Sequence, residues 1–120
     1  MSEIAKNRNL PERVRHACSG VALAWRCERS LRTQAWAALA LLAALAIVRP
    51  APVWWAVAGL AAALVLAAEL VNSALEALID HLHPESHPGI KRVKDIAAGS
   101  VLVASLGALW VGGLMLVSLL

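Results

Sequence analysis

The sequence has 120 residues, of which 60% are hydrophobic and only 16% are charged. This composition is typical of a small membrane protein rather than of a soluble domain. The net charge of +3 comes from basic residues near the ends of the apolar runs, and basic and aromatic residues do not interleave, so the sequence excludes a nucleic-acid partner.

The polar, basic N-terminal segment is predicted to form an amphipathic helix over residues 10–28. Pro11 suits the first turn of a helix, with Asn9 or Leu10 before it. Apolar side chains then recur at steps of three and four residues: Val14, Ala17, Cys18, Val21 and Trp25. Because most of the basic side chains lie elsewhere on the helical wheel, we expect this helix to lie on a membrane surface.

The first membrane span is predicted over residues 30–49. Residues 33–48 carry no charge, but these 16 residues are slightly fewer than the ~20 that a bilayer requires. Arg29 and Arg32 at one end and Arg49 at the other can snorkel to the membrane surface, which extends the span.

Segments that contain proline separate the three predicted spans. The prolines in residues 49–52 break the helix, and we expect the second helix over residues 52–82, with a pair of interfacial tryptophans near its start. A second loop follows, and the 25 uncharged residues 96–120 predict the third span, in a helix over residues 90–119. The predicted fold is an all-α membrane protein, a single domain over residues 1–120 with a surface helix and three transmembrane helices.

The distribution of Lys and Arg predicts the topology. Seven of them lie in the N-terminal segment of residues 1–32 and three in residues 81–95, whereas the proline turn has one and the C-terminus none. The positive-inside rule therefore places the N-terminus and residues 81–95 in the cytoplasm and the C-terminus outside. Because three helices bury little of their own surface, we also expect the chain to oligomerise.

Five polar side chains near the end of the second helix share one face: Glu69, Asn72, Ser73, Glu76 and Asp80. At ~100° per residue they lie within one stripe, opposite an apolar face. At ~1.5 Å per residue Glu69 lies ~27 Å along the helix, near the cytoplasmic edge of a ~30 Å hydrocarbon core. Carboxylates at this depth are costly, which makes them functional candidates.

Glu28, Lys94 and Asp95 flank the first and third spans at the same level. Together with the stripe, these residues supply the parts of a phosphoryl-transfer site. Two carboxylates and an amide can hold Mg²⁺, and a third carboxylate can take a proton from a hydroxyl. A lysine can balance the charge of a phosphate group. The chain has neither a Walker loop nor the soluble-kinase signatures. From these residues alone, a stripe that only joins helices stays open as an alternative.

The motif E-x-x-N-S-x-x-E at residues 69–76, the neighbours Lys94 and Asp95, and the acidic segment at residues 25–32 resemble the prokaryotic diacylglycerol kinase family, which includes undecaprenol kinases. The resemblance covers roughly residues 13–118. It implies a homotrimer with active sites shared between subunits, which transfers the γ-phosphate of Mg-ATP to a lipid hydroxyl on the cytoplasmic side of the bacterial inner membrane.

The resemblance also implies the roles of individual residues. Glu69 would be the general base, and Glu28 and Glu76 would be the ligands of Mg²⁺. The expected ATP-binding residues are His16, Glu28, Asn72, Glu76, Glu85, Ser86, His87, Lys94 and Asp95. The expected contacts of the lipid substrate are Glu69, Ala98, Trp25, Ser30 and Leu31.

The expected acceptor is diacylglycerol, which would give phosphatidic acid, and undecaprenol is the alternative. Gln34 stands where a family member can have Glu, and Ala98 where a serine can occur, and both positions concern the lipid side of the site. A small proton-coupled transporter is the less favoured second class of function, since transporters favour midplane sites and repeats.

Several of these side chains also have ordinary structural interpretations. Glu28 would pair with Arg32 one helical turn away, and Asp80 would pair with Lys91 or Lys94. The three histidines between the second and third spans predict a solvated loop rather than a zinc site.

Overall fold

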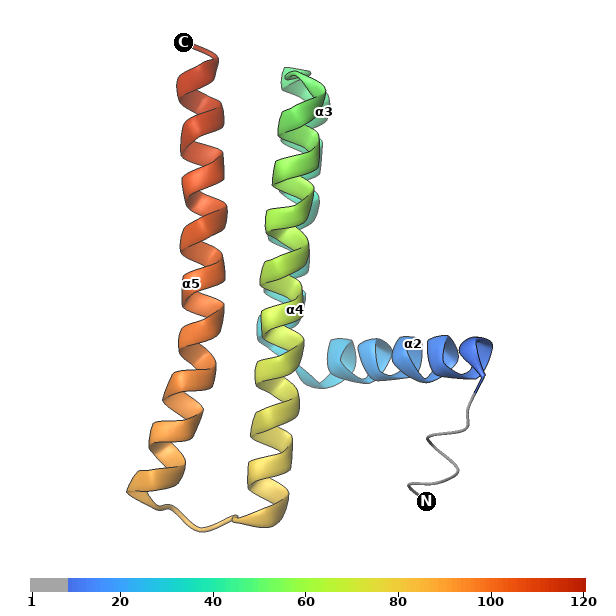
Figure 1. The fold of residues 1–120 in the computed structure, drawn as a ribbon, viewed down its shortest axis with the longest axis vertical. Coiled ribbons are helices and arrows are strands. Elements are labelled where there is room, and N and C mark those ends of the chain that lie inside the picture. Colours follow the sequence, from blue (N-terminus) through green and yellow to red (C-terminus); the bar gives the residue numbers. More distant parts are fainter. Residues whose placement is uncertain (1–8) are drawn as a thin grey trace.

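The computed structural model describes residues 9–120, and in that range the chain forms four helices and no strand (Figure 1). They are α2 (Leu10–Cys27), α3 (Arg29–Val48), α4 (Pro52–Leu82) and α5 (Pro88–Ser118). Helices α3, α4 and α5 are long and apolar enough to cross a membrane. They run side by side, and α2 projects sideways from the start of α3, away from the three long helices (Figure 1). The prediction of an all-α membrane protein is confirmed.

Helix α2 begins with a side-chain cap. The side-chain oxygen of Asn9 accepts a hydrogen bond from the backbone N–H of Glu12 at 3.1 Å, and Pro11 occupies the first turn. None of the residues of α2 is buried, so apolar side chains such as Val14 and Val21 remain exposed. An amphipathic helix with this exposed apolar face suits a membrane surface.

A sharp elbow at Glu28 separates α2 from α3. Glu28 is extended (φ −111°, ψ 106°) and caps both helices: its N–H donates to the Ala24 carbonyl of α2 at 2.8 Å, and its carbonyl accepts from the Arg32 N–H of α3 at 3.4 Å. The Arg32 guanidinium donates to the backbone carbonyls of Trp25 and, at 3.1 Å, Arg26. The rings of Trp25 and Trp36 pack edge to face across the elbow, with 6.3 Å between their centroids. Because the last carbonyls of a helix lack intrahelical partners, Arg32 stabilises the end of α2 and braces the elbow.

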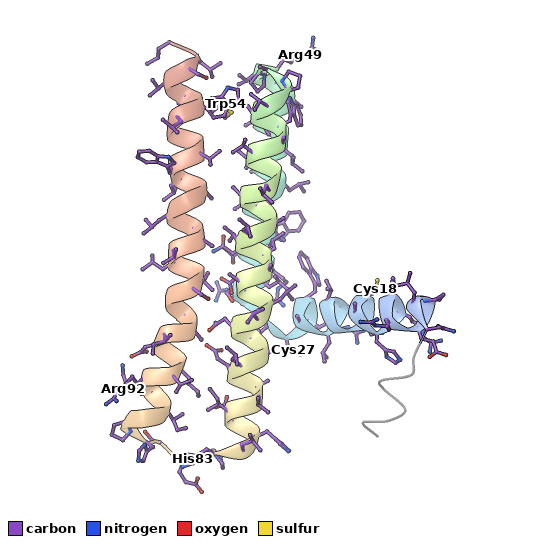
Figure 2. All side chains as sticks on the ribbon, viewed as in Figure 1. Cys18, Cys27, Arg49, Trp54, His83 and Arg92 are labelled. Carbon is purple, nitrogen blue, oxygen red and sulfur yellow. The ribbon has the colours of Figure 1, made fainter. Side chains whose placement is uncertain are left out.

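A tight turn joins α3 to α4 at the other end of the bundle, where Figure 2 labels Arg49 and Trp54. Arg49 adopts the left-handed conformation (φ 53°), and its N–H donates to the Leu45 carbonyl at 2.8 Å. Pro52 then opens α4. Close to this turn lies the apolar core of the chain, in which Leu41 and Trp54 pack against the buried residues Leu45, Ala58 and Met115.

A short loop joins α4 to α5 at the end of the bundle where Figure 2 labels His83 and Arg92. The N–H of His83 donates to the Ile79 carbonyl at 2.7 Å and ends α4. Helix α5 begins at Pro88 rather than at the predicted residue 90, because the His87 ring caps it by accepting from the Gly89 N–H at 2.9 Å. A Cβ atom at position 89 would lie 3.1 Å from that ring nitrogen, so glycine leaves room for the cap.

Most apolar side chains of α3, α4 and α5 are exposed on the single chain. Within residues 9–120 only seven apolar side chains are buried, whereas Ile47, Val103 and Trp110 are each at least 70% exposed. In water such a surface would be unfavourable, but lipid tails or further apolar helices can cover it. The buried parts of the chain are therefore few, and each buried polar group is informative.

Candidate functional site

Two buried polar side chains stand out in the part of the chain that the structure describes, and both lie on α4. Glu69 is 5% exposed and Ser73, one turn later, is 8% exposed. The hydroxyl of Ser30, in the first turn of α3, donates to Oε2 of Glu69 at 3.0 Å. Burial removes water from a carboxylate, and a hydrogen-bond donor offsets part of that cost. Helix α3 therefore holds the Glu69 carboxylate in place.

Asn72 and Glu76 form a second polar pair on α4. The side-chain amide of Asn72 donates to Oε1 of Glu76 at 3.3 Å, across one helical turn. The other side-chain atom of Asn72, Oδ1, is buried and accepts from no donor within residues 9–120. An unpaired buried acceptor costs about 1–3 kcal/mol. A cation or a donor group bound here would remove that cost.

A groove of about 460 Å³ lies between α2 and α4, beside this polar stripe. Small residues, among them Gly20 and Ala24 on α2 and Ala77 on α4, leave the space open. The lining is mostly apolar, and Glu28 and Ser73 supply polar groups. A space of this size and composition suits an apolar ligand that carries one polar group.

The candidate metal ligands are all oxygen donors. Glu28, at the elbow, and Glu76, on α4, are both half-buried. Within residues 9–120 no three His, Cys, Asp or Glu side chains lie close enough together to hold a metal ion. Two carboxylates still fit Mg²⁺, because this ion prefers oxygen ligands and fills its remaining coordination positions with oxygens of water or phosphate. The unpaired side-chain oxygen of Asn72 is a further oxygen that could serve as a ligand.

The ion pair that would give Glu28 an ordinary structural role is not formed. Arg32, one turn away, donates instead to the carbonyls at the end of α2. The Glu28 carboxylate is therefore left without a bound cationic side chain among residues 9–120, on the edge of the groove.

Two ion pairs lie where α4 and α5 extend past the level of α2. Lys94 Nζ is 2.6 Å from Asp80 Oδ1, and Lys91 Nζ is 2.6 Å from Asp95 Oδ2. The predicted pairing of Asp80 with one of these lysines is confirmed, and the partner is Lys94. Both carboxylates and Lys91 are largely exposed, and Lys94 is 35% exposed. Each pair therefore contributes only ~0–1 kcal/mol, so a phosphate group could replace a carboxylate at little cost.

The sequence matches a known protein family over most of its length. Residues 15–116 match the model of the family described as Prokaryotic diacylglycerol kinase. The chain belongs to this family. It is also 34% identical over 109 residues to a curated protein named Diacylglycerol kinase from Synechocystis sp., a match that covers 90% of this chain and 62% of that protein. The predicted family is confirmed, and the chain spans less than two thirds of the length of this relative.

In this member of the prokaryotic diacylglycerol kinase family, the residues predicted to bind ATP lie in separate places. Lys94 and Asp95 lie in the second turn of α5, the helix that follows the loop of residues 85–87. In that loop His83 Nδ1 lies 3.0 Å from the Glu85 carbonyl oxygen, and Ser86 is exposed. His16 lies on α2 and is exposed. A single chain does not bring all of these side chains together.

The residues predicted to contact lipid are also divided. Ser30 and Glu69 are hydrogen-bonded to each other. Trp25 packs against Trp36, and Leu31 is buried with 4% exposure. Ala98 lies on α5 and is exposed. The structure therefore joins Glu69, the expected base, to Ser30. It places Trp25 and Leu31 in packing contacts and Ala98 on another helix.

Sequence reasoning gave no structural role to Arg32 beyond snorkelling or an ion pair. Its guanidinium instead braces the elbow between the surface helix and the first span. A signal for this role was present, because Arg32 lies one turn after the end of a helix whose last carbonyls need donors. A similar signal was present for the contact between Ser30 and Glu69, because the Ser30 hydroxyl and the Glu69 carboxylate lie at the same membrane level.

Proposed function

We propose that this protein is an ATP-dependent lipid kinase that phosphorylates the hydroxyl of diacylglycerol and gives phosphatidic acid. The observation that carries the proposal is the buried Glu69 carboxylate, which accepts a hydrogen bond from Ser30. Glu69 lies one residue before Leu70 and one turn before Ser73, and both of these residues line the groove between α2 and α4. A small apolar groove with a carboxylate next to it suits a lipid whose single hydroxyl must lose a proton. Membership of the diacylglycerol kinase family supports the same class of reaction.

Glu69 acts as the general base in the proposed reaction. Its Oε2 is engaged by Ser30, so Oε1 is the oxygen that accepts the proton of the lipid hydroxyl. The hydroxyl oxygen forms a bond to the γ-phosphorus of ATP, the bond from that phosphorus to the β–γ bridging oxygen breaks, and ADP leaves. A positioned base contributes about 10²–10⁴-fold to the rate of such a step.

Glu28 and Glu76 are the proposed ligands of Mg²⁺, which supplies neutralisation of phosphate charge when it is bound. Asn72 orients Glu76 through its amide and presents its unpaired Oδ1 on the same part of α4. An i,i+4 pair of this kind keeps the Glu76 carboxylate from turning freely, which favours binding of a cation over solvation of the side chain.

The proposed nucleotide site uses the part of α4 and α5 that extends past α2. Lys94 exchanges Asp80 for a phosphate group, and the exposure of their ion pair makes this exchange inexpensive. Asp95 contacts the ribose or base. The remaining proposed contacts with ATP are His16, Glu85, Ser86 and His87.

We further propose a homotrimer with shared active sites, on the cytoplasmic side of the bacterial inner membrane. The large exposed apolar surface of the single chain and the separation of His16 from the α4–α5 loop support assembly. The excess of Lys and Arg before α3 and in the α4–α5 loop supports the cytoplasmic placement.

The test is lipid phosphorylation by the purified protein in mixed micelles with Mg-ATP and either dioleoylglycerol or undecaprenol. The wild type should phosphorylate dioleoylglycerol, and Glu69→Gln should keep the fold and assembly but lose about 10²–10⁴-fold in turnover. Ser118→Ala is the control, because its hydroxyl contacts only the Met115 carbonyl at the far end of α5.

Each other outcome would contradict a definite part of the proposal. If Glu69→Gln turned over as fast as the wild type, Glu69 would not be the general base. Turnover on undecaprenol alone would change the acceptor and leave the residues in the same roles. A trimeric wild-type protein that phosphorylates neither lipid would contradict the kinase activity itself.

A further inference from the structure

The hydroxyl of Ser30 provides the only side-chain hydrogen bond that Glu69 receives within residues 9–120. Ser30 Oγ lies 3.0 Å from Glu69 Oε2, and the bond connects two helices, since the residues are 39 positions apart in the sequence. Glu69 is 5% exposed, so water has little access to the carboxylate. The orientation of this carboxylate therefore depends on one neighbouring hydroxyl group.

The carboxylate of a glutamate rotates broadly about its last side-chain bond, because this torsion has no narrow staggered minima. A donor that is fixed to another helix restricts this rotation by engaging one oxygen. The other oxygen then points in a defined direction. A base must lie within about 2.6–3.2 Å of the proton that it removes, so its orientation directly affects the rate of proton transfer.

We infer that Ser30 is a positioning residue, which fixes the Glu69 carboxylate so that Oε1 faces the substrate hydroxyl. This role differs from the contact with lipid that the sequence suggests for Ser30. It rests on the proposed function, in which Glu69 is the base. Ser30 acts through Glu69 and touches neither the lipid nor the nucleotide.

The position of Ser30 also connects the base to the elbow. Ser30 lies two residues after Glu28, in the first turn of α3, and Arg32 in the same turn holds the end of α2. A rotation of α3 at the elbow would therefore move the Ser30 hydroxyl away from Glu69. The orientation of the surface helix and the orientation of the base are coupled through this short segment.

The test compares Ser30→Ala and Ser30→Thr, with Thr33→Ala as the matched control. Thr33 lies one turn further along α3, and its hydroxyl donates to the Arg29 carbonyl of the same helix at 3.1 Å. Ser30→Ala should lower kcat about tenfold, the effect of losing a hydrogen bond to a charged group. The KM values for ATP and for dioleoylglycerol should stay unchanged, Ser30→Thr should restore most of kcat, and Thr33→Ala should behave like the wild type.

A second measurement does not depend on turnover. The free energy of unfolding in detergent is compared for Ser30→Ala, Glu69→Ala and the double variant. Ser30→Ala should destabilise the wild type but not the Glu69→Ala protein, because the hydroxyl has no carboxylate left to bind. Equal effects in both backgrounds would overturn the hydrogen bond and the inference with it.

The kinetic outcomes separate this inference from the proposed function. An active wild type with unchanged kcat in Ser30→Ala would overturn the positioning role alone. A higher KM for dioleoylglycerol with unchanged kcat would show that Ser30 contacts lipid, and would also overturn it. An inactive wild type would contradict the kinase proposal and, with it, the catalytic purpose of the Ser30 contact.

Discussion

The two ends of α4 differ sharply in what they bury. Near its start Ala58 packs with Leu45 of α3 and Met115 of α5, and no polar side chain takes part in this cluster. Towards its other end the same helix buries Glu69 and Ser73, and a groove separates it from α2. The first end gains stability from apolar packing, whereas the second end accepts the cost of desolvated polar groups. In the proposed reaction, stability and chemistry thus lie at opposite ends of one helix.

After Glu69→Gln, the largest expected effect on activity comes from Glu76→Gln, also at the polar end. Glutamine keeps an oxygen that can accept from Asn72, but it removes a negative charge from the proposed cation site. The Mg²⁺ concentration for half-maximal turnover should rise at least about tenfold to a hundredfold, because this is the cost of disturbing a residue that only supports a metal ligand, and Glu76 is proposed as a ligand itself. A magnesium titration of the lipid kinase assay measures this. An unchanged titration curve would remove Glu76 from the metal site.

Leu45→Ala tests the apolar end. Leu45 is fully buried, so the substitution leaves a cavity and should lower the free energy of unfolding by about 2–5 kcal/mol. Denaturant unfolding in detergent measures the loss, and Leu42→Ala, at an exposed position one turn away, is the control. The KM for ATP of the folded protein should not change. A large change in that KM would mean that the two ends of α4 are not independent.

Arg32→Ala tests the elbow that joins the polar end to the surface helix. The variant loses two hydrogen bonds from a charged group to the end of α2, and the protection of the α2 backbone should fall by ~1.5–3 kcal/mol. Hydrogen exchange measures this protection. Arg29→Ala removes a neighbouring charge that makes no such contact in the described structure. Equal protection in both variants would show that charge alone, and not the bracing contact, holds the elbow.

The smallest expected effect comes from Asp80→Asn. The substitution frees Lys94 from an exposed ion pair worth ~0.2–1 kcal/mol, so the KM for ATP should fall by at most about fivefold. The difference from the wild type should shrink in high salt, because salt screens exposed charges. Glu12→Gln, on α2, controls for net charge. A rise in KM would mean that Asp80 itself contacts the nucleotide.

The sequence was sufficient to predict the fold because its signals are local. Charge-free runs define α3, α4 and α5, and Pro11 and Pro52 each lie in the first turn of a helix. Pro88 lies in the first turn of α5 as well, although the predicted helix began only at residue 90. The polar stripe on α4 followed from helical periodicity in the same way. Helix start and end signals of this kind act over a few residues and need no knowledge of tertiary contacts.

The contacts between helices were harder to predict. That Ser30 donates to Glu69 depends on how α3 is rotated about its axis, which Arg32 and the elbow determine. Likewise the spacing of charges allowed either lysine as the partner of Asp80, and only the packing of α4 against α5 selects Lys94. Side chains on different helices meet according to rotation and tilt, and neither quantity is encoded by periodicity within one helix.

The unequal lengths of the helices have a consequence for where the two substrates meet. Helix α3 has 20 residues and α4 has 31, so at ~1.5 Å per residue they measure ~30 Å and ~46 Å. The first length matches a hydrocarbon core of ~30 Å, and the second exceeds it by ~16 Å. In the proposed reaction this excess forms a stalk that reaches into water. A soluble nucleotide can then approach the site near Glu69 from water while the lipid approaches it from the bilayer. Neither substrate has to leave its own solvent.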